Sequence, residues 1–152
     1  MFTELSTNIK VKYNYIACKQ DTGKEAVCNK VCYKAGNLIE LPDTIYIEIK
    51  LIDKQILGET ILDLRSYNKI TLNSLLTIKE CVLVLTHELI HLSQIHKKQL
   101  TLHKNGNYVW EGKEYINLAK LKTLAYYDYL QLPWEQDVVE KQQNLLENLL
   151  KI

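Results

Sequence analysis

Three residues in the middle of the chain have the types and spacing that zinc-assisted hydrolysis requires. His87, Glu88 and His91 form the pattern H-E-x-x-H. Side chains four residues apart lie one above the other on a helix face, so both imidazoles can reach one metal ion. The glutamate beside the first histidine can then hold a water on that metal and act as a general base. The pattern predicts His87 and His91 as zinc ligands and Glu88 as the catalytic residue.

A structural role is the alternative interpretation for each histidine. A single histidine on an amphipathic helix is usually a hydrogen-bonded residue rather than a metal ligand. Here the surrounding segment is strongly apolar, with Cys81, Val82, Val84, Leu85, Leu89, Leu92 and Ile95 at helical spacing. Burying two imidazoles and a carboxylate among such residues is costly unless something pairs them. A metal ion would do so, and we favour the metal site.

A third protein ligand is expected, because hydrolytic zinc usually has three and leaves one position for water. The candidates downstream are His96, His103, Glu111, Glu114, Asp128, Glu135, Asp137 and Glu140. The extended pattern H-E-x-x-H-x-x-G-x-x-H fails, because Gln94 and Lys97 stand where it needs glycine and histidine. His96 is one residue out of register, whereas His103 stays open as a minor alternative.

Glu135 is the preferred third ligand. It follows Pro133 and Trp134, and proline favours the first turn of a helix. A carboxylate in that turn is held with little freedom, as a metal ligand requires. The alternative is that its charge only complements the helix dipole.

The helix that carries the motif has a clear start signal. Thr77 and Glu80 are spaced as in a capping box, in which each side chain satisfies a free backbone donor of the other residue. A polar tract, Lys97-Lys98-Gln99, follows the apolar run.

Alternating apolar residues predict strands upstream of this helix. Residues 10–17 alternate, and after Pro42 the residues Ile45, Ile47, Ile49 and Leu51 share one face. Two shorter strands are predicted at 60–64 and 69–72. Residues 25–35 fit a short helix ending at Gly36, although a strand stays open. Together these elements predict an α+β fold, with a small sheet whose buried face is covered by the motif helix.

The second half of the chain is predicted to be mainly helical. Asn105-Gly106 indicates a type I′ hairpin turn, and Gly112 ends the strand that follows. Residues 113–130 are interpreted as a helix with Tyr115, Leu118, Ala119 and Tyr126 facing inward. A last helix is predicted from Pro133 onward, with Val138, Val139, Leu145, Leu146, Leu149 and Leu150 at helical spacing.

Composition indicates one globular domain spanning residues 1–152. Apolar residues make up 47% and charged residues 24% of the chain, which is typical of a folded protein. The net charge of +1 makes a nucleic-acid partner unlikely by electrostatics. No signal peptide or membrane-length apolar run is present, so an intracellular, cytoplasmic protein with no membrane partner is expected. Its cysteines, Cys18, Cys28, Cys32 and Cys81, are interpreted as reduced thiols.

The motif followed by a downstream glutamate resembles the zincin metallopeptidases, specifically the gluzincin pattern. The residues Trp110, Gly112 and Tyr115, then Pro133-Trp134-Glu135, also resemble small metallopeptidases encoded by phages and prophages. The resemblance covers about residues 75–140 and is specific at H-E-x-x-H. It implies a zincin-like fold, with a small twisted sheet packed on the active-site helix and a helical C-terminal half that supplies the glutamate.

Zinc-dependent hydrolysis of a protein or peptide substrate is the expected activity. Glu88 would take a proton from the attacking water and pass it to the leaving amine. Tyr115, Tyr126 or Tyr127 could stabilise the oxyanion, and the substrate could pair with a sheet edge at 60–64 or 69–72. The alternative is a catalytically silent zincin-fold component of a larger assembly such as a virion.

Overall fold

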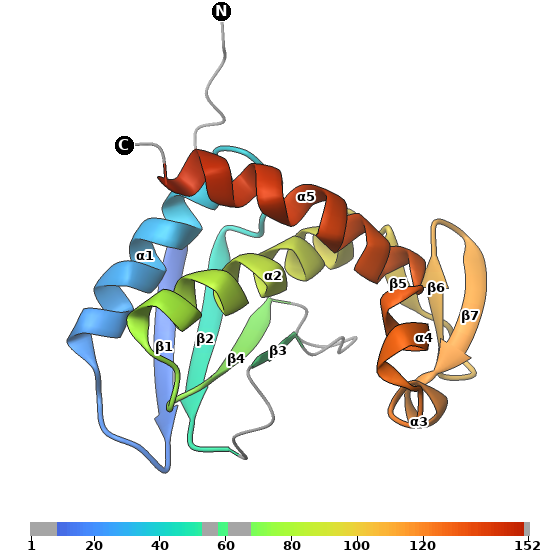
Figure 1. Ribbon diagram of the computed structural model, residues 1–152, viewed down its shortest axis with the longest axis horizontal. Helices are drawn as coiled ribbons and strands as arrows, with labels where there is room; N and C mark the ends of the chain where they lie inside the picture. The colour runs from blue at the N-terminus through green and yellow to red at the C-terminus, as the bar shows by residue number, and fades with distance from the viewer. Residues whose placement is uncertain (1–8, 53–57, 61–67, 151–152) are drawn as a thin grey trace, which may run out of the picture.

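The computed structural model describes residues 9–52, 58–60 and 68–150 of the chain. Helices and strands are mixed, and the strands form two separate small sheets. Figure 1 shows the larger sheet beneath three helices, with the smaller sheet to one side of them. This arrangement is compatible with the predicted α+β class.

The larger sheet has four strands in the order β1-β2-β4-β3. Strands β1 (Lys10–Ile16), β2 (Thr44–Lys50) and β4 (Lys69–Asn73) run parallel to one another. Strand β3 (Gly58–Thr60) runs antiparallel to β4 and forms the edge. The last strand before the motif helix is therefore an internal one.

The predicted strands are confirmed with three adjustments. Leu51 lies beyond the end of β2 and is 49% exposed, so it does not extend the buried isoleucine row. The predicted strand at 69–72 is β4, which has neighbours on both sides and is not a sheet edge. Of the predicted strand at 60–64, only Thr60 lies within the described residues, as the last residue of β3.

Helices α1 (Thr22–Gly36) and α2 (Ile78–His96) cover one face of this sheet (Figure 1). The side chains that β2 and β4 direct to this face are buried aliphatic residues, namely Ile45, Ile47, Ile49, Ile70 and Leu72. They pack against Cys28 and Cys32 of α1 and against Leu85 and Leu89 of α2. Full burial of one such aliphatic side chain contributes about 1.5–3 kcal/mol. The predicted one-sided core is confirmed, with α1 sharing the cover.

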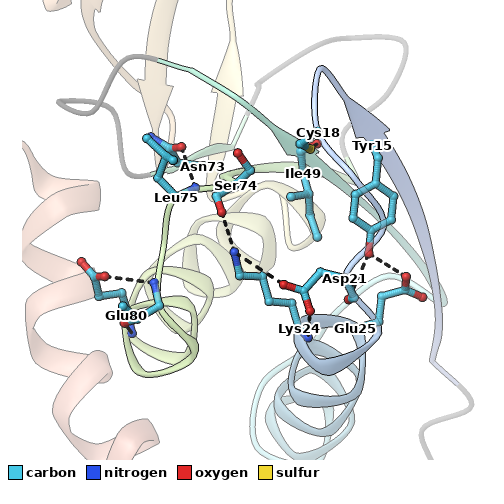
Figure 2. A network of polar contacts seen from close by, with 11 residues as sticks. Tyr15, Cys18, Asp21, Lys24, Glu25, Ile49, Asn73, Ser74, Leu75 and Glu80 are labelled. Carbon is cyan, nitrogen blue, oxygen red and sulfur yellow. Dashed lines mark hydrogen bonds and ion pairs between the residues drawn. The ribbon is translucent and has the colours of Figure 1, made fainter.

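Both covering helices begin at side-chain caps. The capping box predicted at Thr77 and Glu80 is present, with both reciprocal hydrogen bonds formed. Asp21 caps α1 by accepting a hydrogen bond from the backbone N–H of Lys24. Figure 2 shows the Lys24 side chain crossing from α1 to the carbonyl of Ser74, in the loop that leads into α2. This buried lysine therefore ties the start of α1 to the approach of the motif helix.

The second sheet is an antiparallel meander of β5 (Leu100–Leu102), β6 (Asn107–Trp110) and β7 (Lys113–Asn117). Its first turn is not type I′, because only Gly106 has a positive φ there (88°). The His103 carbonyl accepts from the Gly106 N–H, giving a three-residue loop with glycine in the left-handed position. Both central residues of the second turn, Glu111 and Gly112, have positive φ, as a type I′ turn requires.

The prediction of one helix over residues 113–130 is wrong. Residues 113–117 form β7, and only two short helices follow, α3 (Leu118–Leu121) and α4 (Tyr126–Leu130). Lys113 pairs with Trp110 across the tight turn, so hydrogen bonding to β6 decides the conformation of this segment. Tyr126, expected to face inward, is 76% exposed. The C-terminal half is thus less helical than the sequence indicated.

The last helix, α5 (Pro133–Leu150), begins at the proline as predicted. In Figure 1 it lies along α2 in the opposite direction, with its first turn near the end of α2. Val138, Leu145 and Leu149 are buried in the main core, whereas Val139 is 59% exposed. Trp134 instead joins a smaller core with Ile95, Leu100 and Leu132. This second core fixes the first turn of α5 against the end of α2.

Candidate metal centre

Helix α2 presents the two histidines of the motif on the same face, one turn apart. The ring centroids of His87 and His91 lie 4.9 Å apart, and the rings are inclined by 72°. The His91 side chain is 10% exposed and the His87 side chain 32%. His91 is therefore the more buried of the two histidines, and His87 is partly open to solvent.

Glu135, in the first turn of α5, lies against both histidines. Its Oε1 atom is 3.0 Å from Nε2 of His91, and its Oε2 atom is 3.6 Å from Nε2 of His87. The three side chains each offer one ligand atom, and these atoms all lie within 4.8 Å of one another. Residues from two helices, predicted as a set from their types and spacing, thus form a possible metal-binding triad.

The donor set and its geometry fit a zinc ion. In tetrahedral coordination with bonds of about 2.1 Å, neighbouring ligand atoms lie about 3.4 Å apart. The separations of 3.0 Å from Oε1 to His91 and 3.6 Å from Oε2 to His87 fall on either side of that value, and the three ligand atoms lie within 4.8 Å of one another. Glu135 is 3% exposed, and a carboxylate so deeply buried needs a positive partner, which a metal or a histidine proton can supply.

Gln94 contacts His91 from the side opposite the triad. The Nδ1 atom of His91 lies 2.9 Å from Oε1 of Gln94. The Gln94 amide nitrogen donates to the Trp134 carbonyl at 2.9 Å and to Oδ2 of Asp137 at 2.8 Å. An amide nitrogen committed to two acceptors leaves its oxygen for His91, so the His91 Nδ1 carries the hydrogen and Nε2 faces Glu135.

Tyr129 is a site residue that the sequence did not reveal. Its hydroxyl, on α4, donates a 2.6 Å hydrogen bond to Oε1 of Glu135. The three tyrosines considered for oxyanion stabilisation are other residues. Tyr126 and Tyr127 are 76% and 72% exposed, and Tyr115 packs edge-on against the Trp134 ring. The signal in the sequence that could have suggested Tyr129 is its position six residues before Glu135, close to the start of the last helix.

Glu88 is buried on α2, between the two histidines in sequence, with 7% of its surface exposed. Its negative charge is among the lesser causes that raise the pKa of both His91 and Tyr129. Glu88 is thus a buried carboxylate next to the first motif histidine and outside the converging triad, as expected of a group that acts on a bound water rather than on the metal.

The charges of the triad shift one another's pKa values. Burial alone would lower the pKa of His91, but the hydrogen bond and charge of Glu135 outweigh it and raise the pKa to about 9. Burial likewise opposes ionisation of Glu135, yet its contacts with His91 and Tyr129 hold its pKa below the usual value. Burial, followed by the Glu135 charge, raises the pKa of Tyr129. Without metal, the described geometry favours a proton shared between His91 and Glu135.

The other candidate ligands lie elsewhere. His103, the alternative third ligand, lies in the β5–β6 hairpin with its Nδ1 atom 3.5 Å from Oε1 of Glu114. His96 is exposed at the end of α2. Asp137 is near the triad, but its Oδ2 atom accepts from Gln94 and from Lys141. Among the described residues, the groups close enough together to hold a metal are His87, His91 and Glu135.

No family model, curated protein or solved structure matches the chain. The candidate metal centre is therefore argued from its own geometry. Within the described residues, no helix has both the length and the apolar character needed to cross a membrane.

Proposed function

We propose that the chain is a zinc-dependent metallopeptidase with His87, His91 and Glu135 as ligands and Glu88 as general base. The observation that supports this most is the convergence of Glu135 on both motif histidines, from a helix far along the chain. Zinc at these three residues would supply Lewis-acid chemistry, lowering the pKa of a coordinated water to about 7 and polarising a substrate carbonyl.

The residues of the chain would carry the proton transfers. Glu88 accepts a proton from the attacking water and returns it to the leaving amine, a role worth roughly 10²–10⁴ in rate. Tyr129 holds Oε1 of Glu135 through its 2.6 Å hydrogen bond. Gln94 keeps the Nε2 atom of His91 directed toward the metal position. The partly exposed His87 leaves the approach to the site open for substrate.

We infer that a substrate is bound in an extended conformation along β3. An extended peptide can add a strand to an exposed sheet edge through main-chain hydrogen bonds. Of the two edges considered from the sequence, β4 already has partners on both sides, whereas β3 is paired only with β4 among the described strands. Strand β3 also lies against α2, the helix that carries the histidines.

A zincin-like fold is part of this proposal. It is supported by a mainly parallel sheet with an antiparallel edge strand, a covering helix with the H-E-x-x-H pattern, and a later helix that supplies the glutamate. The competing proposal, a catalytically silent component of a larger assembly, would keep the same fold, with or without the metal.

Proteolysis with and without zinc separates these two proposals. Purified protein is incubated with casein after removal of metal by a chelator, and again after one equivalent of zinc is restored. Cleavage that stops on chelation and returns with zinc supports the peptidase. A protein that binds zinc stoichiometrically but cleaves neither casein nor a random peptide library would instead support the silent component.

A further inference from the structure

Gln94 has every polar group of its side chain engaged, although it is 1% exposed and lies outside the H-E-x-x-H pattern. It accepts from Nδ1 of His91 and donates to the Trp134 carbonyl and to Asp137, all at 2.8–2.9 Å. A buried amide with three good hydrogen bonds has a single orientation, because turning it over would set oxygen against oxygen at Trp134 and Asp137.

The first consequence concerns His91. A neutral imidazole can ligate a metal through only the nitrogen that lacks the hydrogen. Because the Gln94 oxygen accepts a hydrogen bond, one hydrogen is kept on Nδ1, so Nε2, the atom 3.0 Å from Glu135, supplies the lone pair to a metal once the proton shared with Glu135 has left. Partners of this kind on ligating histidines typically change metal affinity 10–100-fold when removed.

The second consequence concerns Glu135. Trp134 and Asp137 flank Glu135 in the first turn of α5, and the Gln94 amide binds both of them. The same side chain therefore sets the position of this turn relative to α2. Gln94 thus fixes the position of His91 relative to Glu135, although Gln94 is not itself one of the metal ligands.

We propose that Gln94 is the positioning residue of the metal centre, selecting the ligating nitrogen of His91 and fixing the α5 turn that carries Glu135. This inference rests on the proposed metal site. It predicts that the centre is assembled before metal binds, so that zinc enters a formed site rather than drawing the two helices together.

Zinc affinity of the Gln94→Met variant tests the inference. Methionine keeps the unbranched shape and removes all three hydrogen bonds. Metal-free protein is titrated with zinc at 10 °C and pH 7.5 in competition with a chromophoric chelator, with folding checked by circular dichroism. We expect zinc to bind 10–100-fold more weakly than in the wild type.

Val138→Ala is the matched control for loss of packing. Val138 is fully buried on α5 beside the same interface, but has no polar contact with the triad. This variant should lower the melting temperature of the protein while keeping zinc affinity within about twofold. Equal losses of affinity in Val138→Ala and Gln94→Met would mean that Gln94 acts only through general stability, and would overturn the inference.

A second pair of variants keeps the test valid if Gln94→Met does not fold. Gln94→Glu keeps the shape but sets a carboxylate oxygen against Asp137, so zinc affinity should fall. Adding Asp137→Asn supplies an amide donor to the new carboxylate and should restore at least tenfold of the loss. No recovery in the double variant would contradict a positioning role.

The outcomes also separate this inference from the proposed function. If the wild type itself binds no zinc, the metal site is wrong and the proposed role of Gln94 in it is overturned as well. If the wild type binds zinc and Gln94→Met binds it equally well, the metal site stands and Gln94 is not its positioning residue.

Discussion

Oε1 of Glu135 lies 3.0 Å from Nε2 of His91, although the two residues belong to different helices and to distant parts of the sequence. The contact joins the middle of α2 to the first turn of α5. Oε1 of Glu135 is also held by Tyr129, so a single buried oxygen receives contacts from two elements. Such convergence of a carboxylate with two imidazoles is the feature from which the metal centre is argued.

The base role of Glu88 predicts a separation of metal binding from catalysis. Glu88→Gln should retain about one zinc per chain and lose hydrolysis by roughly 10²–10⁴-fold, because the amide cannot accept the proton. His87→Ala should lose both properties and serves as the comparison. Measurement needs zinc content and the initial rate of casein cleavage on the same preparations. Turnover near the wild-type rate in Glu88→Gln would remove Glu88 from this role.

The hydrogen bond from Tyr129 predicts a contribution to metal affinity. Tyr129→Phe removes the hydroxyl that fixes Oε1 of Glu135 and should weaken zinc binding about tenfold, as loss of a ligand's supporting partner commonly does. Tyr126→Phe, on the same short helix but 76% exposed, is the matched control and should have no effect. Competition titration gives both values. An unchanged affinity in Tyr129→Phe would show that the histidines alone hold the carboxylate.

The raised pKa of His91 predicts a pH dependence of the metal-free protein. Its folded pKa is about 9 against 6.5 for an unperturbed histidine. A raised folded pKa adds stability that is complete below pH 6.5 and is lost as pH rises through about 9. Chelator-treated protein should therefore lose on the order of 2 kcal/mol of unfolding free energy between pH 6.5 and 8.5.

Urea unfolding at several pH values measures this loss. Glu135→Gln is the control, because it removes the carboxylate that raises the pKa of His91 and should flatten the dependence. Ionisation of the buried thiols in the unfolded chain also lowers stability toward pH 8.5, and the Glu135→Gln variant measures that contribution so that it can be subtracted. Stability that is constant or rises across this window in the metal-free wild type would contradict the His91–Glu135 ion pair.

The environments of the cysteines predict selective reactivity. Burial raises the pKa of Cys28 to about 12 and also raises those of Cys32 and Cys81. Cys18 is partly exposed. At pH 8 one thiol should react quickly with a chromogenic disulfide reagent, and all four of the sequence should react in denaturant. Cys18→Ser should abolish the fast phase, and a fast phase of two or more thiols would be inconsistent with this packing.

The parts of the fold that were predictable have local signals. The capping box at Thr77, the apolar stripe of α2 and the proline at the start of α5 act within a few residues, so sequence alone identifies them. The triad itself followed from chemistry, because two histidines four apart require a third donor held with little freedom. Its closeness in space then depended on α5 lying along α2, which no local signal states.

The parts that were missed depend on contacts between segments. Residues 113–130 carry Tyr115, Leu118 and Ala119 at helical spacing, yet pairing with β6 makes residues 113–117 a strand. The Asn105-Gly106 pair predicted a two-residue type I′ turn, but the hairpin closes through a three-residue loop that ends at Gly106. Tyr129 and Gln94 were missed as site residues because their partners, Glu135 and His91, are brought to them by tertiary packing.

Zinc content of the purified protein, compared between the wild type and Glu135→Ala, tests the central claim most directly. Elemental analysis after dialysis should give about one zinc per chain in the wild type and a marked loss in the variant, because the carboxylate that contacts both histidines is gone. A wild type that takes up no zinc even when refolded with it, or a Glu135→Ala variant that keeps its full zinc content, would contradict the metal centre.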